Sequence, residues 1–148
     1  AEGREFILGG IKLEFDKGLL GHSDADVLLH AITDAILGAA ALGDIGAHFP
    51  DTDSDFKNAD SKILLKKAYE LVKQKDYELV NIDSTVILEK PKLRPFIDEM
   101  RMVIAGCFGT SIDNISIKAT TNEKMGFVGK GEGCVAMAVA LIQKTSKK

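Results

Sequence analysis

One apolar segment constrains this sequence most, because it leaves a helix little polar surface to turn toward solvent. Residues 27–42 read VLLHAITDAILGAAAL, and only His30, Thr33 and Asp34 among them are polar. A surface helix shows a broad polar face, so the segment predicts a helix that is nearly buried all round. Because a buried charge must be paired or bound to a metal, we expect His30 and Asp34 to share a sheltered pocket or an interface.

The start of this helix carries a second signal. Ser23 is a candidate N-cap, with Asp26 in the capping-box position. Asp26, His30 and Asp34 are spaced by four residues, so they form one stripe on a helix over about residues 24–42. An imidazole between carboxylates suits a divalent metal, with one group as ligand and a neighbour that orients it. The alternative is an acidic solvated face with an incidental histidine.

Length and composition indicate one ordinary globular domain that spans residues 1–148. Apolar residues make up 45% of the chain and charged residues 28%, which is typical of such domains. The net charge of −3 argues against non-specific binding to nucleic acid or to a membrane surface. No apolar run is long enough to span a bilayer, and no signal peptide is visible.

Cys107 and Cys134 lie in apolar surroundings, so we expect two buried structural thiols in a reducing compartment.

The remaining patterns predict an α/β (α+β) domain with the element order ββααβαββ. Two short strands flank Gly9-Gly10, Gly43 is a candidate C-cap for the apolar helix, and a loop is expected over residues 44–58. Asp60 or Ser61 is expected to cap a helix at 60–74, whose apolar face comprises Ile63, Leu64, Ala68, Leu71 and Val72. The other expected elements are a helix at 96–107 and strands at 79–88, 115–120 and 133–143.

Two of these strands enclose a helix. Residues 79–120 therefore predict a right-handed βαβ unit with parallel strands, within a mixed sheet packed against helices. The last strand is apolar at both alternating sets of positions, so we expect both of its faces to be covered.

Polar residues gather in four segments that border these elements, at 21–26, 44–53, 89–95 and 120–132. Thr120 and Thr121 at a strand end, next to glycines and lysines, suit an oxyanion cradle, and Glu123 suits a hard cation such as Mg²⁺. The alternative is a plain hairpin loop. The glycines of residues 126–131 match neither a P-loop nor a dinucleotide fingerprint, and the flanks do not suit an RNA-binding clamp. Because no nucleophile is set up, catalysis would depend on metals and positioning.

Two long motifs run through this sequence. The first comprises HSDADV at 22–27, residues 30–46 and FPDTD at 49–53; the second is KATTNEK at 118–124 with the glycine-rich residues 126–133. Together they resemble the motifs of the 2-C-methyl-D-erythritol 2,4-cyclodiphosphate synthase family. The similarity runs over about residues 6–142 with almost no gaps. It implies an α/β subunit of a homotrimer with active sites between neighbouring subunits. The implied reaction cyclises 4-diphosphocytidyl-2-C-methyl-D-erythritol 2-phosphate and releases CMP, in the cytoplasm of a bacterium or in a plastid-like compartment.

The resemblance also implies residue roles. His30 would be a ligand of Zn²⁺ or a similar divalent ion, and Glu123 would hold Mg²⁺ or Mn²⁺. The catalytic residues would be His22, Asp34, Thr121 and Glu123. The residues that would contact the phosphates, the methylerythritol or the cytosine are His22, Ser23, Asp44, Gly46, Phe49, Asp51, Leu88, Pro91, Lys92, Leu93, Ala119, Thr120, Thr121, Phe127 and Lys130.

The sequence departs from the family in two places. The family carries an Asp-x-His pair shortly before the first hairpin, where this sequence has only residues 1–4 nearby. Either that pair lies upstream of Ala1, or the zinc site lacks two ligands. Lys130 stands where many members have Arg, and Lys lacks the bidentate fork that grips a phosphate. The alternative function is therefore a non-catalytic trimer that binds a nucleotide or a phosphate without a complete zinc site.

Overall fold

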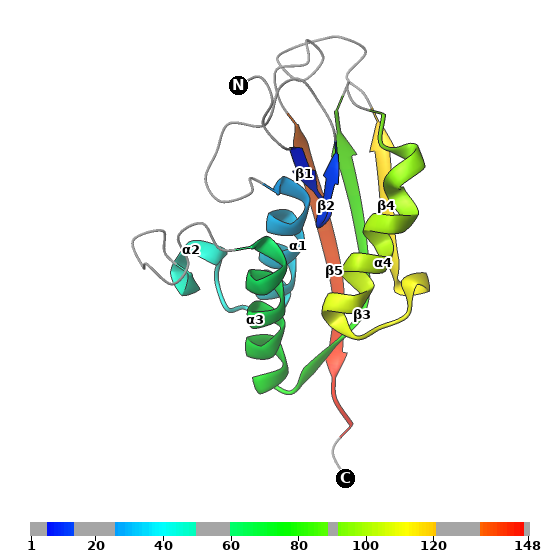
Figure 1. Cartoon of the computed structure of the whole chain (residues 1–148). Coiled ribbons are helices and arrows are strands. Elements are labelled where there is room, and N and C mark those ends of the chain that lie inside the picture. The colour runs from blue at the N-terminus through cyan, green and yellow to red at the C-terminus, as the bar shows by residue number, and fades with distance from the viewer. Residues whose placement is uncertain (1–5, 14–25, 50–59, 89–91, 121–133, 147–148) are drawn as a thin grey trace.

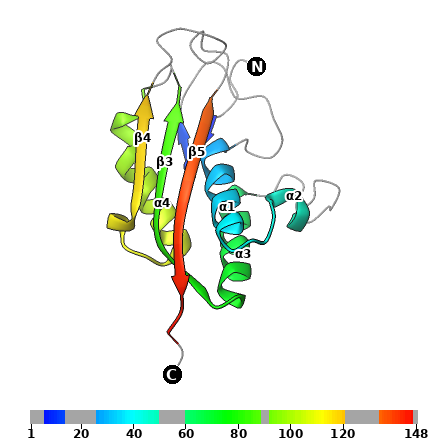
Figure 2. The ribbon, with the colours of Figure 1, turned by 180° about the vertical axis from the view of Figure 1, so that it is seen from behind.

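The computed structural model describes residues 6–13, 26–49, 60–88, 92–120 and 134–146. These residues form a mixed α and β domain in which the helices lie on one face of a three-stranded sheet (Figures 1 and 2). The observed order contains the expected ββααβαββ and adds a short helix and two 3₁₀ turns. None of the described helices combines the length and apolar character that crossing a membrane requires.

The predicted hairpin at Gly9-Gly10 is confirmed. Strands β1 (Phe6–Leu8) and β2 (Ile11–Leu13) pair in antiparallel fashion. Both glycines have positive φ angles, of 60° and 82°, which a residue with a Cβ adopts only at a cost. A Cβ on Gly9 would also lie 2.7 Å from Cγ of Met100, so the turn sits directly against helix α4 (Ile97–Phe108).

The apolar helix begins and ends at other residues than predicted. Helix α1 covers Val27–Ala39, and its N-cap is Asp26, whose carboxylate accepts from the Leu29 amide at 3.0 Å. Ser23 lies outside the described residues. The C-cap is Ala40 and not Gly43, because the chain reverses with Ala41 in the left-handed conformation.

Two backbone bonds close this reversal and replace the expected glycine cap. The Leu42 amide donates to the Leu37 carbonyl at 2.8 Å, and the Ala41 amide donates to the Gly38 carbonyl at 3.0 Å. Together they form a Schellman motif in which alanine occupies the position that glycine usually takes.

The expectation that α1 is nearly buried all round is wrong for the single chain. One face is fully buried and includes Leu28, Ile32 and Ile36. Asp34 and Gly38 on another face are exposed. The sequence contains few polar residues there, but the helix still turns one side away from the core.

The segment after α1 contains a short helix, α2 (Ile45–His48), where a loop was expected. Asp44 caps it, because its carboxylate accepts from the Ala47 amide at 3.0 Å. Helix α3 (Ser61–Gln74) has the predicted bounds, with Asp60 as N-cap. Of its predicted apolar face, Ile63 is 49% exposed, so the helical period placed that residue wrongly.

The sheet has the order β4-β3-β5 and is mixed, as predicted. Strand β3 (Tyr77–Ile87) pairs in parallel with β4 (Ile115–Thr120) and antiparallel with β5 (Val135–Lys144). Helix α4 connects the two parallel strands between the 3₁₀ turns η1 (Arg94–Phe96) and η2 (Ile112–Asn114). The parallel pairing predicted for the βαβ unit is confirmed.

Strand β5 is covered on one face only within this chain. Its alanines 136, 138 and 140 pack against the core below the helices. The alternating residues Met137, Val139 and Leu141 are exposed by 54%, 71% and 54%. Figure 2 shows the sheet from this side, with its strands in front of the helices. The prediction that both faces are covered is therefore wrong for the isolated subunit.

Candidate functional site

His30 lies in the first turn of α1 and is half-buried. Its ring nitrogen Nε2 lies 3.2 Å from the hydroxyl oxygen of Ser61, the first residue of α3. Asp60 fixes where α3 begins, because its carboxylate accepts from the Lys62 amide at 2.8 Å. The contact therefore joins the N-terminal turns of two helices that pack side by side (Figure 1).

Asp26 does not act as the metal-orienting carboxylate that the four-residue spacing suggested. Its Oδ1 accepts from the amides of Gly9 and Leu29, both at 3.0 Å, and its Oδ2 accepts from the Gly10 amide at 2.8 Å. The residue is completely buried. Both carboxylate oxygens thus bind backbone amides and fasten the β1-β2 turn to the start of α1.

Asp34 lies one turn after His30 but is exposed, so the two do not share a buried pocket. Its Oδ1 accepts from the Ile45 amide at 2.8 Å, which holds α2 beside α1. Three other predicted substrate contacts lie along the same segment: Asp44, Gly46 and the buried Phe49. These residues and His30 form a first group, which we call the α1-side group.

A second group lies at the carboxyl ends of β3 and β4. The Leu88 amide donates to the Thr120 carbonyl at 3.1 Å, and Ala119 pairs with Val86 across the two strands. Leu88 is 8% exposed, whereas Thr120 is exposed. The other two described members are Lys92, which is exposed, and Leu93, which is buried. We call this set the strand-end group.

The two groups lie beside different strands of the sheet. Helix α1 packs on β5, which forms one edge, whereas β4 forms the other edge (Figures 1 and 2). The remaining predicted site residues lie outside the described residues: His22, Ser23, Asp51, Pro91, Thr121, Glu123, Phe127 and Lys130.

The described residues offer an incomplete metal site. Among them, no three side chains of His, Cys, Asp or Glu are grouped as metal ligands would be. A catalytic zinc site normally takes three protein ligands. His30 has the chemistry of one such ligand, and its stripe neighbours Asp26 and Asp34 are held by backbone amides.

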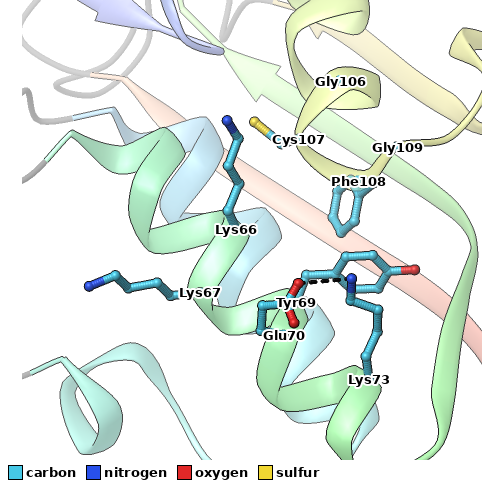
Figure 3. Close-up of a pocket in the computed structure, with 9 residues that line it drawn as sticks. All are labelled: Lys66, Lys67, Tyr69, Glu70, Lys73, Gly106, Cys107, Phe108 and Gly109. Carbon is cyan, nitrogen blue, oxygen red and sulfur yellow. Dashed lines mark ion pairs between the residues drawn. The ribbon is translucent and has the colours of Figure 1, made fainter.

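A cavity of about 410 Å³ lies elsewhere, between α3 and the end of α4 (Figure 3). Its floor includes the rings of Tyr69 and Phe108, which meet edge to face with centroids 4.9 Å apart. Lys73 and Glu70 form an ion pair of 2.9 Å at its margin. None of the predicted site residues lines this cavity, so it takes no part in the candidate site.

The two thiols are free and half-buried, less sheltered than expected. Burial raises the pKa of the Cys134 thiol to about 12, and the negative charge of Asp26 adds to the effect. Burial also raises the pKa of Cys107, although Lys66 and Lys62 oppose it.

We expect Cys134 in the folded protein to react slowly with iodoacetamide at pH 8. The thiolate is the nucleophile, and a pKa near 12 in place of 9.0 lowers its population roughly a thousandfold. Mass spectrometry of labelled peptides, with and without denaturant, measures the effect. Complete native labelling of Cys134 at the rate of the unfolded chain would contradict the assignment.

Sequence reasoning missed two functions of polar residues. Ser61 appeared only as a possible cap, although it contacts His30 from another helix. Asp26 appeared as a metal neighbour, although it binds the hairpin turn. The available signal was the Gly9-Gly10 pair, because two adjacent turn amides need an acceptor.

Comparisons with known proteins identify the family. Residues 1–143 match the YgbB family. The 2-C-methyl-D-erythritol 2,4-cyclodiphosphate synthases of Chloroherpeton thalassium and Bacillus cytotoxicus are 59% and 60% identical, with 97% of this chain and 91% of each relative covered.

Solved structures agree with this assignment. A 2C-methyl-D-erythritol-2,4-cyclodiphosphate synthase in its CDP-bound form superimposes with a TM-score of 0.87 at 34% identity, covering 97% of this chain and 93% of that one. The bifunctional IspDF of Campylobacter jejuni gives a TM-score of 0.92 at 46% identity; 97% of this chain is covered, which corresponds to 39% of that longer protein. The chain therefore belongs to the YgbB family, whose named relatives are 2-C-methyl-D-erythritol 2,4-cyclodiphosphate synthases.

Proposed function

We propose that this protein converts 4-diphosphocytidyl-2-C-methyl-D-erythritol 2-phosphate into 2-C-methyl-D-erythritol 2,4-cyclodiphosphate and CMP. The identity of about 60% to synthases over 97% of the chain carries this proposal. A 2-phosphate oxygen forms a bond to the β-phosphorus, and the bond from that phosphorus to the oxygen that bridges it to the α-phosphate breaks. CMP leaves with that oxygen.

The residues suit a reaction whose attacking group is already an anion. Such a phosphate needs no serine or histidine to activate it, but two phosphates must be held together against their repulsion. In this proposal Thr120, Thr121 and Lys130 hold the phosphates, and His22 and Ser23 contact the phosphates or the methylerythritol. Divalent ions, zinc at His30 and Mg²⁺ or Mn²⁺ at Glu123, would supply neutralising charge when bound.

Turnover of the cytidylyl substrate by the full-length protein tests this function directly. With zinc and Mg²⁺ present, ³¹P NMR should show the cyclic diphosphate and an equal amount of CMP. The incomplete ligand set of the described residues favours one other candidate, a trimer that binds nucleotide without catalysis. Nucleotide binding with no CMP release from the substrate would select that candidate.

We further propose that the active protein is a homotrimer. The uncovered face of β5 exposes three large apolar side chains in a row, which is typical of a surface that another subunit covers. The α1-side group belongs to helices on the β5 side of the sheet, whereas the strand-end group follows the central strand β3 and the opposite edge strand β4. A closed ring would bring the α1-side group of one subunit to the strand-end group of its neighbour.

Val139→Lys should dissociate this trimer. Val139 is the most exposed of the three residues, and an unpaired lysine buried in each copy of an interface is strongly unfavourable. Light scattering at micromolar concentration should give three times the 16.0 kDa subunit mass for the unmodified protein and a lower mass for the variant. Met102→Lys on α4, at a side chain that is 59% exposed in the helix layer, is the matched control. A monomeric unmodified protein would contradict the trimer, and a variant that stays trimeric would exclude this face.

Cytidine nucleotides should bind more tightly than adenosine nucleotides. In the sequence, the buried residues Leu88 and Leu93 of the strand-end group flank a short segment that contains Pro91. Proline fixes φ and limits backbone motion. A slot shaped for a pyrimidine would be overfilled by a purine. Calorimetry should show CDP binding at least about tenfold more tightly than ADP, or about 1.4 kcal/mol. Equal affinities would remove the cytosine assignment.

A further inference from the structure

The contact between Ser61 and His30 has a consequence for the metal. The Ser61 hydroxyl comes from a different helix, 31 residues away in sequence. Its side chain is almost fully buried, at 1% exposure. A buried hydroxyl is retained where it makes hydrogen bonds, and one of its neighbours is the imidazole Nε2 at 3.2 Å.

The Ser61 hydroxyl is not needed to cap its own helix. Asp60 is the N-cap of α3, and its carboxylate accepts from the Lys62 amide. The Asp60 carbonyl accepts the first backbone bonds of the helix, from the amides of Ile63 and Leu64. The N-cap role that serine often has at a helix start is therefore filled by Asp60 in α3.

The two ring nitrogens of His30 are therefore not equivalent. The Ser61 oxygen occupies the direction of Nε2, so Nδ1 is the nitrogen that remains for a metal. A histidine ligand usually donates its other N–H to an oxygen acceptor, which fixes the tautomer and the ring orientation. A carboxylate often has this role, but the neighbouring Asp26 and Asp34 accept from backbone amides instead.

We propose that Ser61 is a positioning residue for His30: its Oγ accepts the Nε2–H and holds the ring so that Nδ1 faces the metal. This inference rests on the proposed zinc site. It concerns which nitrogen binds and what holds the ring, and it leaves the identity of the other ligands open. Because serine is a neutral acceptor, the effect belongs at the lower end of the range found for such supporting residues.

Ser61→Ala should weaken zinc binding about tenfold, measured on the full-length protein by competition with a chelator. Ser84→Ala is the matched control, because Ser84 is also buried, at 2% exposure, and its hydroxyl donates to the Ser116 carbonyl at 2.9 Å, in the sheet. The control should keep the zinc affinity of the unmodified protein. Ser61→Thr keeps the hydroxyl and should restore most of the affinity.

A second measurement needs no substitution at Ser61. In protein with ¹⁵N-labelled histidine loaded with ¹¹³Cd²⁺, the metal–nitrogen coupling should appear at Nδ1 of His30. Coupling at Nε2 would overturn the inference, as would an unchanged zinc affinity in a folded Ser61→Ala protein.

The outcomes separate this inference from the proposed zinc site. If His30→Ala abolishes zinc binding and Ser61→Ala does not weaken it, the site stands and the role of Ser61 is wrong. If His30→Ala leaves zinc affinity unchanged, or the unmodified protein binds no zinc, the proposed site fails and the role of Ser61 fails with it.

Discussion

His30→Ala protein is expected to lose zinc binding and at least about a hundredfold in turnover, while it keeps its fold. Metal ions contribute several kcal/mol of charge stabilisation to such transition states, and about 2.7 kcal/mol corresponds to a hundredfold in rate. The structural cost is small, because alanine is the best helix former and the lost contact to Ser61 is one hydrogen bond, worth about 1 kcal/mol.

Two comparisons make this result specific to His30. His48→Ala removes another half-buried imidazole, whose Nε2 donates to the Leu42 carbonyl, and should leave zinc affinity unchanged. Glu123→Gln should spare zinc but weaken the second cation and slow turnover. Metal content and chelator competition measure zinc, and CMP release measures turnover. Full activity of the His30→Ala protein in metal-free buffer would contradict the assignment of His30 as a zinc ligand.

Local signals in the sequence predicted the local structure well. The Gly9-Gly10 pair indicated a hairpin, and Asp60 indicated the start of α3, because turn and cap chemistry act over a few residues. The parallel pairing of β3 and β4 followed from a strand, a helix and a strand in succession. In each case the determining residues lie within one short segment or one connection.

Contacts between distant residues were harder to predict. Helix α1 starts after Asp26 because its carboxylate binds an amide 17 residues away in the hairpin turn, and no local pattern separates this residue from Ser23. The apolar residues of α1 and β5 predicted full burial, but a sequence pattern does not distinguish a core from a surface that a second subunit would cover. The exposed Val139 in β5 illustrates this ambiguity.

In the candidate site, too, the local signal was predicted and the contact between distant residues was not. His30 was recognised as a metal ligand candidate from its motif, and the structure places it at a helix start with a polar neighbour. The identity of that neighbour depends on how α1 and α3 pack. The four-residue spacing instead favoured Asp26 and Asp34, and the structure uses both to bind backbone amides.

Among the substitutions proposed here, Asp26→Ala is expected to cause the largest loss of stability. The free energy of unfolding should fall by about 3 to 5 kcal/mol. The change leaves three backbone amides without their acceptor, those of Gly9, Gly10 and Leu29. A hydrogen bond to a charged group contributes about 1.5 to 3 kcal/mol, and a buried donor left unpaired costs about 1 to 3 kcal/mol. The sum is reduced because the turn relaxes and water reaches some of these amides.

Asp60→Ala provides the matched control for this loss. Asp60 is also a helix N-cap, but it is exposed and its carboxylate accepts from the single amide of Lys62 among the bonds described. Loss of such a cap costs about 1 kcal/mol. Urea unfolding at one fixed protein concentration should therefore separate the two variants by at least about 2 kcal/mol. Equal losses would show that the ties to Gly9 and Gly10 add nothing, and that Asp26 is an ordinary helix cap rather than the residue that fastens the hairpin to the helix of His30.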